Sequence, residues 1–217
     1  MNLIISIVSQ RRFERLMSVH DKLAIPISVS MMGRGTAEQS MLDLLGMKAD
    51  KKRIVMAVAN SEKTERYIQE IKEQVNIGVH GHGVVITIPI KSIGGGKMVN
   101  SLSEGEKPVK EMPQVSDRHE LIVVIANEGR TDDVMDAARS AGATGGTVLH
   151  GKGSANEETA RFLNISISSE KEVILIVALK EKKADIMRGI LSKAGPGTEA
   201  SAITFSVPVA TVAGFGL

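Results

Sequence analysis

Apolar and amphipathic stretches alternate along this chain in an order that occurs twice. In the second half, apolar runs predict four buried strands, at residues 121–126, 147–150, 172–179 and 202–207. Apolar residues at helical spacing predict two helices, at residues 131–141 and 181–194, and each is followed by a glycine. Thr131 is the predicted N-cap of the first helix, and a further short helical stretch is predicted at residues 157–162.

The first half carries the same order of elements. Its predicted strands are residues 3–8, 27–31, 54–59 and 84–88, and its predicted helices are residues 13–23 and 62–75. Residues 3–7 match residues 121–125 at an offset of 118 (121 − 3), and Val58-Ala59 matches Val177-Ala178 at an offset of 119 (177 − 58). Matches in the same order along a whole half indicate a tandem duplication with one inserted residue.

The repeat divides the chain into two predicted domains and a linker. The domains are residues 1–96 and residues 118–217. Residues 97–117 are polar, contain two prolines and lack an apolar period, which is typical of a linker.

The order of elements in each copy, βαββαβ, predicts an α+β fold. It is the order of the ferredoxin-like split βαβ unit, an antiparallel four-stranded sheet with both helices on one face. The chain is therefore predicted to hold two tandem ferredoxin-like domains. Because the central strands are apolar on both faces, we expect the face without helices to pack on another sheet, within an assembly of domains or chains.

The composition excludes several functional classes. Lys and Arg number 27 against 25 Asp and Glu, and this balance does not provide the basic face that nucleic-acid binding requires. The absence of cysteine excludes disulfides, thiolate metal sites and cysteine catalysis. The apolar run at residues 3–8 is too short to span a membrane and is followed by Arg11-Arg12, so we predict a cytoplasmic protein without membrane insertion.

A glycine-rich turn with one cation precedes a short predicted helix in each copy. The two turns are Gly33-Arg34-Gly35-Thr36 and Gly151-Lys152-Gly153-Ser154. Free backbone N–H groups beside a cation are typical of a site for an anion. The alternative is a plain glycine turn with a solvated cation.

Residues 78–83 of the first copy join a helix to a strand with four glycines and two histidines. His80 and His82 could share a divalent metal with a carboxylate from another chain, although two imidazoles are an incomplete ligand set and a plain solvent loop is the alternative. The second copy has Thr198-Glu199-Ala200-Ser201 at this position, so a metal role would belong to the first copy alone. The chain carries no nucleophile motif and no carboxylate pair placed for acid–base catalysis, so we expect a protein that is not an enzyme.

Two segments of the second copy resemble the PII nitrogen-regulatory signal-transduction proteins. Ala143-Thr144-Gly145-Gly146-Thr147-Val148-Leu149-His150-Gly151-Lys152-Gly153 resembles the second strand of that family and its run into the T-loop. Phe205-Ser206-Val207-Pro208-Val209, followed by Val212-Ala213-Gly214, resembles its last strand and tail. The resemblance implies a trimer of ferredoxin-like domains with inward-facing sheets. It also implies ATP or ADP in clefts between subunits, where the T-loop base, the loop before the last strand and the tail meet.

The anion turns and the resemblance together define a predicted ligand site at the loops. Its predicted residues are Gly33, Arg34, Gly35, Thr36, Gly81, His82, Gly83, Gly151, Lys152, Gly153, Ser154, Gly197, Thr198 and Glu199. In the family, a Gly-Lys pair precedes the last strand. The first copy has Gly81-His82 there, with the glycine but not the lysine, and the second copy has Ala200-Ser201, with neither residue. The implied cofactor is thus an adenine nucleotide with degraded phosphate contacts, since each charged hydrogen bond lost costs ~1.5–3 kcal/mol. Tyr67 is the only tyrosine and lies in a predicted helix, so uridylylation of a T-loop tyrosine is not expected.

Three hypotheses for the function follow. The first is a PII-like regulatory protein without catalytic activity, a homo-oligomer and preferably a trimer, which senses a small ligand and passes the signal to a protein target. The second is a divalent-metal-binding oligomer similar to CutA-type proteins, which would need His80 and His82. The third is a structural scaffold that binds partner proteins.

Overall fold

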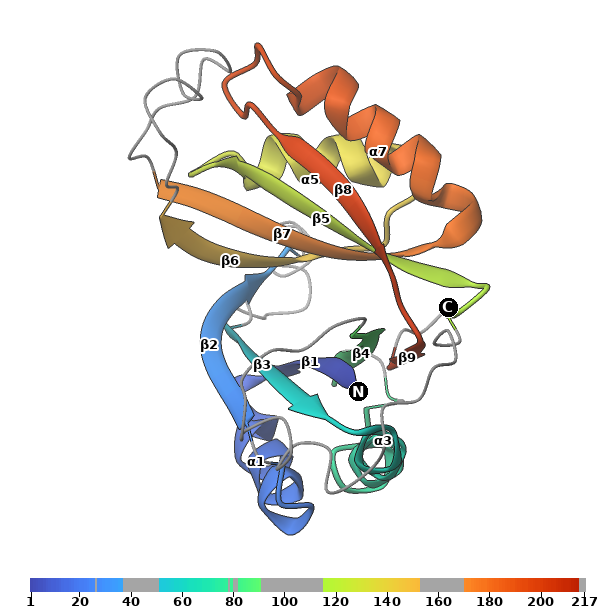
Figure 1. The fold of residues 1–217 in the computed structure, drawn as a ribbon. Helices are drawn as coiled ribbons and strands as arrows, with labels where there is room; N and C mark the ends of the chain where they lie inside the picture. Colours follow the sequence, from blue (N-terminus) through green and yellow to red (C-terminus); the bar gives the residue numbers. More distant parts are fainter. Residues whose placement is uncertain are drawn as a thin grey trace, which may run out of the picture. The chain divides into compact units, whose positions relative to one another are not determined.

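The strands and helices follow the predicted order in both copies (Figure 1). The structure is a computed structural model that describes residues 1–25, 27–36, 51–77, 79, 82–90, 115–152 and 170–214. The first copy forms β1 (Asn2–Ser9), η1 (Gln10–Arg12), α1 (Phe13–Lys22), β2 (Ile27–Gly35), β3 (Lys51–Ala59), α3 (Ser61–Gln74) and β4 (Gly83–Pro89). The second copy forms β5 (His119–Asn127), α5 (Thr131–Ser140), β6 (Thr147–Lys152), β7 (Glu170–Leu179), α7 (Lys180–Ala194), β8 (Ile203–Pro208) and β9 (Thr211–Ala213).

Three details differ from the sequence-based expectation or lie beyond it. The apolar pattern did not predict β9, a strand of three residues. The N-cap of α5 is Arg130 rather than Thr131, and the Thr131 hydroxyl instead donates to Glu172 Oε2 at 2.6 Å. The predicted cap was therefore wrong: Thr131 is the first residue of the helix itself, and its hydroxyl donates a charge-assisted hydrogen bond to a buried carboxylate. The helical stretch predicted at residues 157–162 lies outside the described residues.

The chain divides into two compact units, and each takes a segment from the other copy. Unit 1 comprises Met1–Met32, Lys51–Ser116 and Pro208–Leu217, and unit 2 comprises Gly33–Asp50 and Asp117–Val207. Unit 1 thus includes β9 of the second copy, and unit 2 includes the end of β2 of the first copy. The sequence repeat and the compact units are two different divisions of the chain, and the boundaries predicted at residues 96 and 118 describe the repeat.

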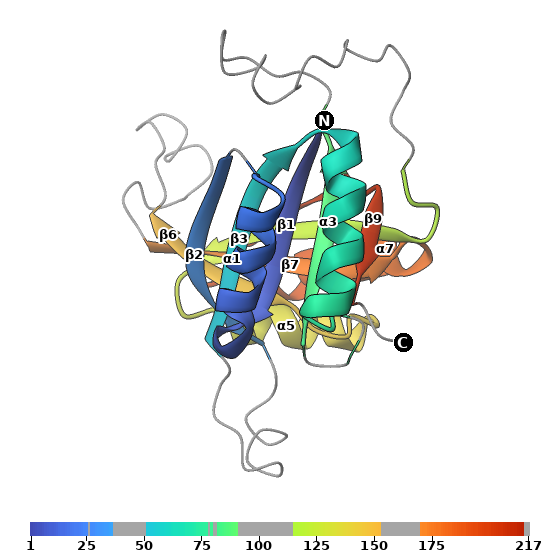
Figure 2. The same cartoon turned by 90° about the horizontal axis from the view of Figure 1, so that it is seen from below.

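The sheet of unit 1 has the strand order β2-β3-β1-β4-β9. The central strand β1 pairs antiparallel with β3, from Asn2↔Ala59 to Ser9↔Lys52, and with β4 up to Val8↔Gly83. Helices α1 and α3 lie side by side on one face of these strands (Figure 2). This is the arrangement of a ferredoxin-like unit, extended at one edge by β9.

The sheet of unit 2 has the order β8-β5-β7-β6, and the end of β2 adds to the outer edge of β6. Strand β7 pairs antiparallel with β5, from His119↔Leu179 to Asn127↔Lys171. It also pairs antiparallel with β6, from Thr147↔Leu175 to Lys152↔Glu170. The second copy therefore forms the same α+β arrangement as the first.

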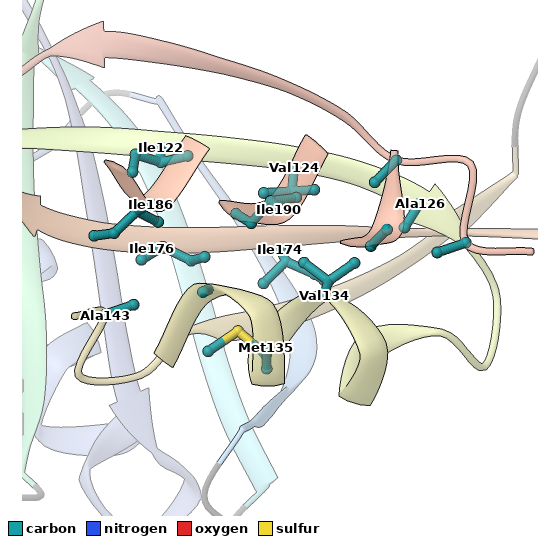
Figure 3. Packing of buried hydrophobic residues seen from close by; sticks show 14 of the residues in the cluster. Ile122, Val124, Ala126, Val134, Met135, Ala143, Ile174, Ile176, Ile186 and Ile190 are labelled. Carbon is teal, nitrogen blue, oxygen red and sulfur yellow. The ribbon is translucent and has the colours of Figure 1, made fainter. Parts of the chain in front are cut away.

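The helix-facing cores of the two units use equivalent positions of the repeat. Ile122, Ala126, Val134 and Ile190 are buried together in unit 2, where Figure 3 shows them between the strands and the helices. The equivalent residues in the core of unit 1, by the same two offsets, are Ile4, Val8, Leu16 and Ile71. The shared apolar period thus predicted the core of each copy.

The strands are apolar on their second face as well. Ile5, Ile7 and Ile86 of unit 1 are buried but lie outside its helix-facing core. Leu121, Leu175 and Val177 are in the same situation in unit 2. Because side chains of a strand alternate between faces, these residues belong to the face opposite the helices. Within the described part of the chain, no helix is long and apolar enough to cross a membrane.

Candidate functional site

The predicted anion turn of the first copy is built into the sheet of unit 2. Arg34 lies opposite Val148, and Gly35 lies opposite Thr147, on the outer edge of β6. The Thr36 N–H donates to the Gly146 carbonyl at 3.2 Å, and the Gly146 N–H donates to Thr36 Oγ1 at 2.8 Å. The Arg139 guanidinium in turn donates to the Thr36 carbonyl. The polar backbone and side-chain groups of Thr36 are therefore engaged with protein partners, whereas Arg34 is exposed.

Gly146 lies in a tight place beside β7. A Cβ placed on it would lie 3.1 Å from the Leu175 carbonyl oxygen and 3.2 Å from a side-chain carbon of Ile176. A larger residue would therefore need these neighbours to shift by a few tenths of an ångström, at the point where the Thr36 segment attaches. The glycine at the start of this strand thus has a packing role that the sequence pattern left open.

The predicted turn of the second copy begins at the far end of β6. Gly151 is exposed and lies opposite Lys171 of β7, and Lys152 lies opposite Glu170. Gly153 and Ser154 lie outside the described residues. Val148, the partner of Arg34, precedes Lys152 by four residues, so the backbones of the two predicted cations are separated by ~13 Å along the strand.

The end of β6 and the loop before β8 meet at one end of the sheet of unit 2. Lys171 lies between Gly151 of β6 and Asn127 of β5 in the strand ladders. The Asn127 N–H donates to the Ala200 carbonyl at 2.9 Å, and Asn127 Nδ2 donates to the Glu199 carbonyl at 2.8 Å. The structure therefore brings two of the predicted ligand segments, one at Gly151 and one at Glu199, to the same row of residues.

Within this row, Lys171 is a cation that the sequence reasoning missed. Its Nζ donates to Asn127 Oδ1 at 2.5 Å. Burial lowers the pKa of Lys171 below its ordinary value, because removing water disfavours the charged ammonium group. In the sequence, Lys171 stands between two glutamates at the start of an apolar run. This pattern is also typical of a strand end exposed to solvent, so it did not single out the lysine.

The loop before β8 is held by its own hydrogen bonds and by one ion pair. Gly197 has a φ of +91°, in the region that favours glycine, and the Thr198 hydroxyl donates to the Gly195 carbonyl at 2.8 Å. The Glu199 carboxylate pairs with the Arg130 guanidinium at the start of α5. Glu199 of the loop therefore occupies a guanidinium, that of Arg130, which could otherwise bind an anionic ligand.

A buried carboxylate lies beside this row. Glu172 is 2% exposed, and its Oε2 accepts the hydrogen bond from Thr131. Its Oε1 lies 3.8 Å from Nδ1 of the half-exposed His150, so the two form an ion pair only when the imidazole is protonated. Neither Glu172 nor His150 was singled out from the sequence.

The equivalent loop of the first copy holds one described histidine. Nδ1 of His82 donates to the Asn76 carbonyl at 3.0 Å, which leaves the lone pair on Nε2. Gly83 has a φ of +140°, and a Cβ on it would lie 2.4 Å from the Ile7 carbonyl oxygen. His80 and Gly81 lie outside the described residues. The described residues contain no group of three His, Asp or Glu side chains placed to hold a metal ion.

Unit 1 also buries a polar triad between its sheet and helices. The Tyr67 hydroxyl lies 2.8 Å from Ser6 Oγ and 3.0 Å from His20 Nε2, while His20 Nδ1 is buried without a hydrogen-bond partner. Burial lowers the pKa of His20 to about 4, against a smaller raising effect of Asp21. Burial likewise raises the pKa of Tyr67 above its ordinary range, although the hydrogen bond with Ser6 opposes this. His20 is buried on α1, and no pattern in the sequence revealed its partners.

These features define the class of the protein as an α+β protein of ferredoxin-like units whose glycine-rich loops converge at one end of a sheet. The family model of the nitrogen regulatory protein P-II matches residues 119–215, which make up most of the second copy. The resemblance noted in the sequence of the second copy is thereby confirmed.

The chain was also compared with solved structures and with curated proteins. The chain is similar to the PII protein of Arabidopsis thaliana, whose crystal structure contains citrate, at 21% sequence identity and a TM-score of 0.33. That similarity covers 42% of this chain and 75% of the Arabidopsis chain. No curated protein matches the sequence.

Proposed function

We propose that the chain is a PII-like signal-transduction protein that senses a small anionic ligand and has no catalytic activity of its own. The observation that carries this proposal is the convergence, within a P-II domain, of the end of β6 and the loop before β8 at Lys171 and Asn127. Two cations lie near this row of residues, Lys171 and Arg130, and Gly151 is exposed. An anion that binds there would compete with Asn127 for Lys171, and with Glu199 and Asp133 for Arg130.

The ligand class that fits best is an adenine nucleotide held by few phosphate contacts. In this proposal the nucleotide lies against the loops of unit 2, with the segment from Gly151 to Ser154 on one side and the loop containing Gly197, Thr198 and Glu199 on the other. Because Glu199 already neutralises Arg130, the ligand has to compete with a carboxylate, so we expect weaker binding than a free guanidinium would support.

This competition supplies a mechanism for sensing. An anionic group that binds Arg130 would release the Glu199 side chain, and the loop would keep the hydrogen bonds of its backbone, with Asn127 and within its own turn among them. The position of the loop would then depend on the ligand, and a protein target could read the difference. We further propose that the protein acts in the cytoplasm as a homo-oligomer, with a trimer favoured.

A thermal-shift panel tests the proposal on the full chain. The panel contains ATP, ADP, cyclic di-AMP, 2-oxoglutarate, bicarbonate and divalent metals, and a ligand at a hundred times its Kd adds ~2.7 kcal/mol of stability. A ligand of the anionic class is expected to raise the melting temperature. Stabilisation by metal ions alone would instead favour the metal-binding hypothesis, for which the free Nε2 of His82 is the specific observation.

Two substitutions with opposite expected signs locate the site. Lys152→Ala should weaken binding about tenfold or more, the loss of one charged hydrogen bond worth ~1.5–3 kcal/mol. Glu199→Gln should tighten binding, because it removes one of the two carboxylates, Glu199 and Asp133, that compete for Arg130. Lys193→Ala, at the exposed end of α7, is the matched control and should leave affinity unchanged. If neither Lys152→Ala nor Glu199→Gln alters the affinity, the assignment of the site is wrong.

A further inference from the structure

Cations gather in unit 1 where η1 packs against the start of β3 and leads directly into the first turn of α1. We refer to residues 10–16 and 51–53 as the basic corner. Its cations are Arg11, Arg12, Arg15, Lys51, Lys52 and Arg53. Arg11, Arg15 and Lys51 are exposed, and Glu14 is the only carboxylate of the corner.

The equivalent corner of unit 2 has lost most of these charges. The offsets of the repeat place Gly129, Asp133, Glu170 and Glu172 where unit 1 has Arg11, Arg15, Lys51 and Arg53. Arg12 keeps its charge in the second copy as Arg130, but there the guanidinium is paired with Asp133 at 3.5 Å. The shared fold therefore does not require cations at this corner, and the charge of unit 1 needs another explanation.

One guanidinium of the basic corner is held in a fixed orientation. Nε of Arg53 donates to Gln10 Oε1 at 2.8 Å, and Cζ lies 4.8 Å from the centre of the Phe13 ring in a cation–π contact. The two terminal nitrogens of Arg53 pair with no carboxylate of the described residues. A guanidinium oriented in this way is suited to bind a carboxylate through two parallel hydrogen bonds.

We infer that the basic corner binds an acidic peptide segment of a partner protein, with one of its carboxylates on Arg53. Lys51 and Arg53 are two residues apart on one strand, so they lie on the same face about 7 Å apart. Alternate side chains of an extended peptide have the same spacing, so acidic residues at alternate positions meet both cations. Arg11 and Arg15 are exposed beside them and attract further carboxylates.

Two other kinds of polyanion fit the basic corner less well. Stable binding to a lipid surface combines cations with apolar side chains that insert, and none of the exposed large hydrophobic residues of the described chain belongs to this corner. Single-stranded nucleic acids stack their bases on aromatic side chains. The only aromatic ring of the corner, Phe13, already contacts Arg53.

This inference rests on the proposed function in one respect, that the protein has a protein target, and it names the chemistry of that target. The contact uses none of the residues of the proposed ligand site in unit 2. Peptide binding is therefore measured without the small ligand. Lys152→Ala should leave the affinity for the peptide unchanged, and Arg53→Gln should leave the thermal shift by the small ligand unchanged, so a failure of one proposal is distinguishable from a failure of the other.

Fluorescence anisotropy with the unmodified full chain tests the binding. The probe is a labelled extended peptide of about eight residues that alternates glutamate and serine, and the control peptide has glutamine in place of glutamate. Only the glutamate peptide is expected to bind, and its affinity should fall as the salt concentration rises, because the charges are screened. No binding at low salt, or equal binding of the glutamine peptide, would overturn the inference.

Substitutions locate the contact. Arg53→Gln should weaken peptide binding about tenfold or more, because it removes the oriented guanidinium. Lys51→Glu gives the corner the residue of unit 2 and should also weaken binding, and its exposed position keeps the test valid if Arg53→Gln lowers the melting temperature. Arg66→Gln, at an exposed arginine of α3 in the same unit, is the matched control and should leave the affinity unchanged. An equal effect of Arg66→Gln, or none from the two corner variants, would exclude the basic corner as the contact.

The same assay separates the acidic peptide from other polyanions. A labelled DNA duplex and vesicles that contain phosphatidylserine replace the peptide, at physiological salt and with the same variants. We expect the peptide to bind more tightly than either of them. Tighter binding of DNA or of vesicles that Arg53→Gln and Lys51→Glu abolish would overturn the choice of an acidic peptide as the partner.

Discussion

The helix-facing cores of the two units differ most at three equivalent positions. Unit 1 has the hydrogen-bonded triad of Ser6, His20 and Tyr67. By the offsets of the repeat, unit 2 has Val124, Ala138 and Ile186 at these positions, and all three are buried in its aliphatic core. Figure 3 shows Val124 and Ile186 in this core. One fold thus accepts a polar or an apolar centre, provided that each buried hydroxyl finds a partner.

The difference has an energetic consequence. A hydrogen-bonded triad gains little net stability over water, and the partnerless Nδ1 of His20 carries a desolvation cost. The aliphatic centre of unit 2 has no such cost and no titratable group. We therefore expect the two units to respond differently to acid and to substitution, although their topology is shared.

The largest expected difference is in the response to acid. Burial lowers the pKa of His20 to about 4, below the value of 6.5 in the unfolded chain. The stabilisation by the neutral imidazole is complete above pH 6.5 and is lost as the pH falls through 4, a difference of about 3 kcal/mol. Fluorescence of Tyr67, the only tyrosine of a chain without tryptophan, reports on the core of unit 1 and should show unfolding at a lower urea concentration at pH 4 than at pH 7.

The control for this prediction is His20→Ala, which places in unit 1 the residue found at the equivalent position of unit 2. This variant should lose much less stability between pH 7 and pH 4 than the unmodified chain. Equal losses in the two proteins would show that His20 is not the group responsible.

A smaller effect is expected from Tyr67→Phe. The change removes the hydroxyl that serves both Ser6 and His20, and leaves their polar groups buried without a partner. The expected loss is ~1–3 kcal/mol in the free energy of unfolding of unit 1, measured by hydrogen exchange of the β1 amides. Ile186→Val, at the equivalent position of unit 2, removes one methyl group and should cost ~0.5–1.5 kcal/mol. A loss from Tyr67→Phe clearly below that of Ile186→Val would contradict a stabilising role for the triad.

The apolar period of the sequence predicted the fold because it records which face of each element is buried. Ile4 and Val8 are four residues apart on one strand, so they lie on the same face. Leu16 and Ile71 belong to the apolar faces of two different helices, and these faces pack on the same core. The apolar period could not predict that β9 joins unit 1 or that the end of β2 joins unit 2. The pairing of β9 with β4, and of Arg34 with Val148, joins residues far apart in sequence and depends on which edges of the sheets are open.

The candidate site was predicted in part for a similar reason. Glycine-rich turns are visible in the sequence, so Gly151 and Gly197 were identified. Lys171 and Asn127 acquire their role only when β7 lies between β5 and β6 and the loop before β8 folds back on Asn127. The hydrogen bonds of Thr36 with Gly146 likewise connect the two copies of the repeat and leave no local signal.

The smallest expected effect concerns a second pair of equivalent contacts between a strand and a helix. Unit 1 has a neutral hydrogen bond, from Asn2 Nδ2 to Thr64 Oγ1 at 3.4 Å. Unit 2 has an ion pair at the same positions, in which Lys183 Nζ lies 3.0 Å and 2.9 Å from the two carboxylate oxygens of Glu120. Burial alone would raise the pKa of Glu120, but hydrogen bonds from Lys183 and Ser206 outweigh it and hold the pKa below its usual value. The stabilisation by this ion pair is therefore present above the unfolded pKa of 4.5 and is lost as the pH falls through the lowered folded value.

Replacing Glu120 and Lys183 by Asn and Thr, the residues of unit 1, should lower the free energy of unfolding of unit 2 by about 1 kcal/mol, because the pair is only partly buried and the neutral replacement keeps one hydrogen bond. Urea unfolding monitored by hydrogen exchange of the β5 amides measures the loss, which should shrink in high salt as the charges are screened. Asp185→Asn breaks the exposed pair with Arg188 on the same helix and should change stability by much less. A loss equal to that of Asp185→Asn, or one that does not depend on salt, would mean that the ion pair of unit 2 contributes no more than the neutral contact of unit 1.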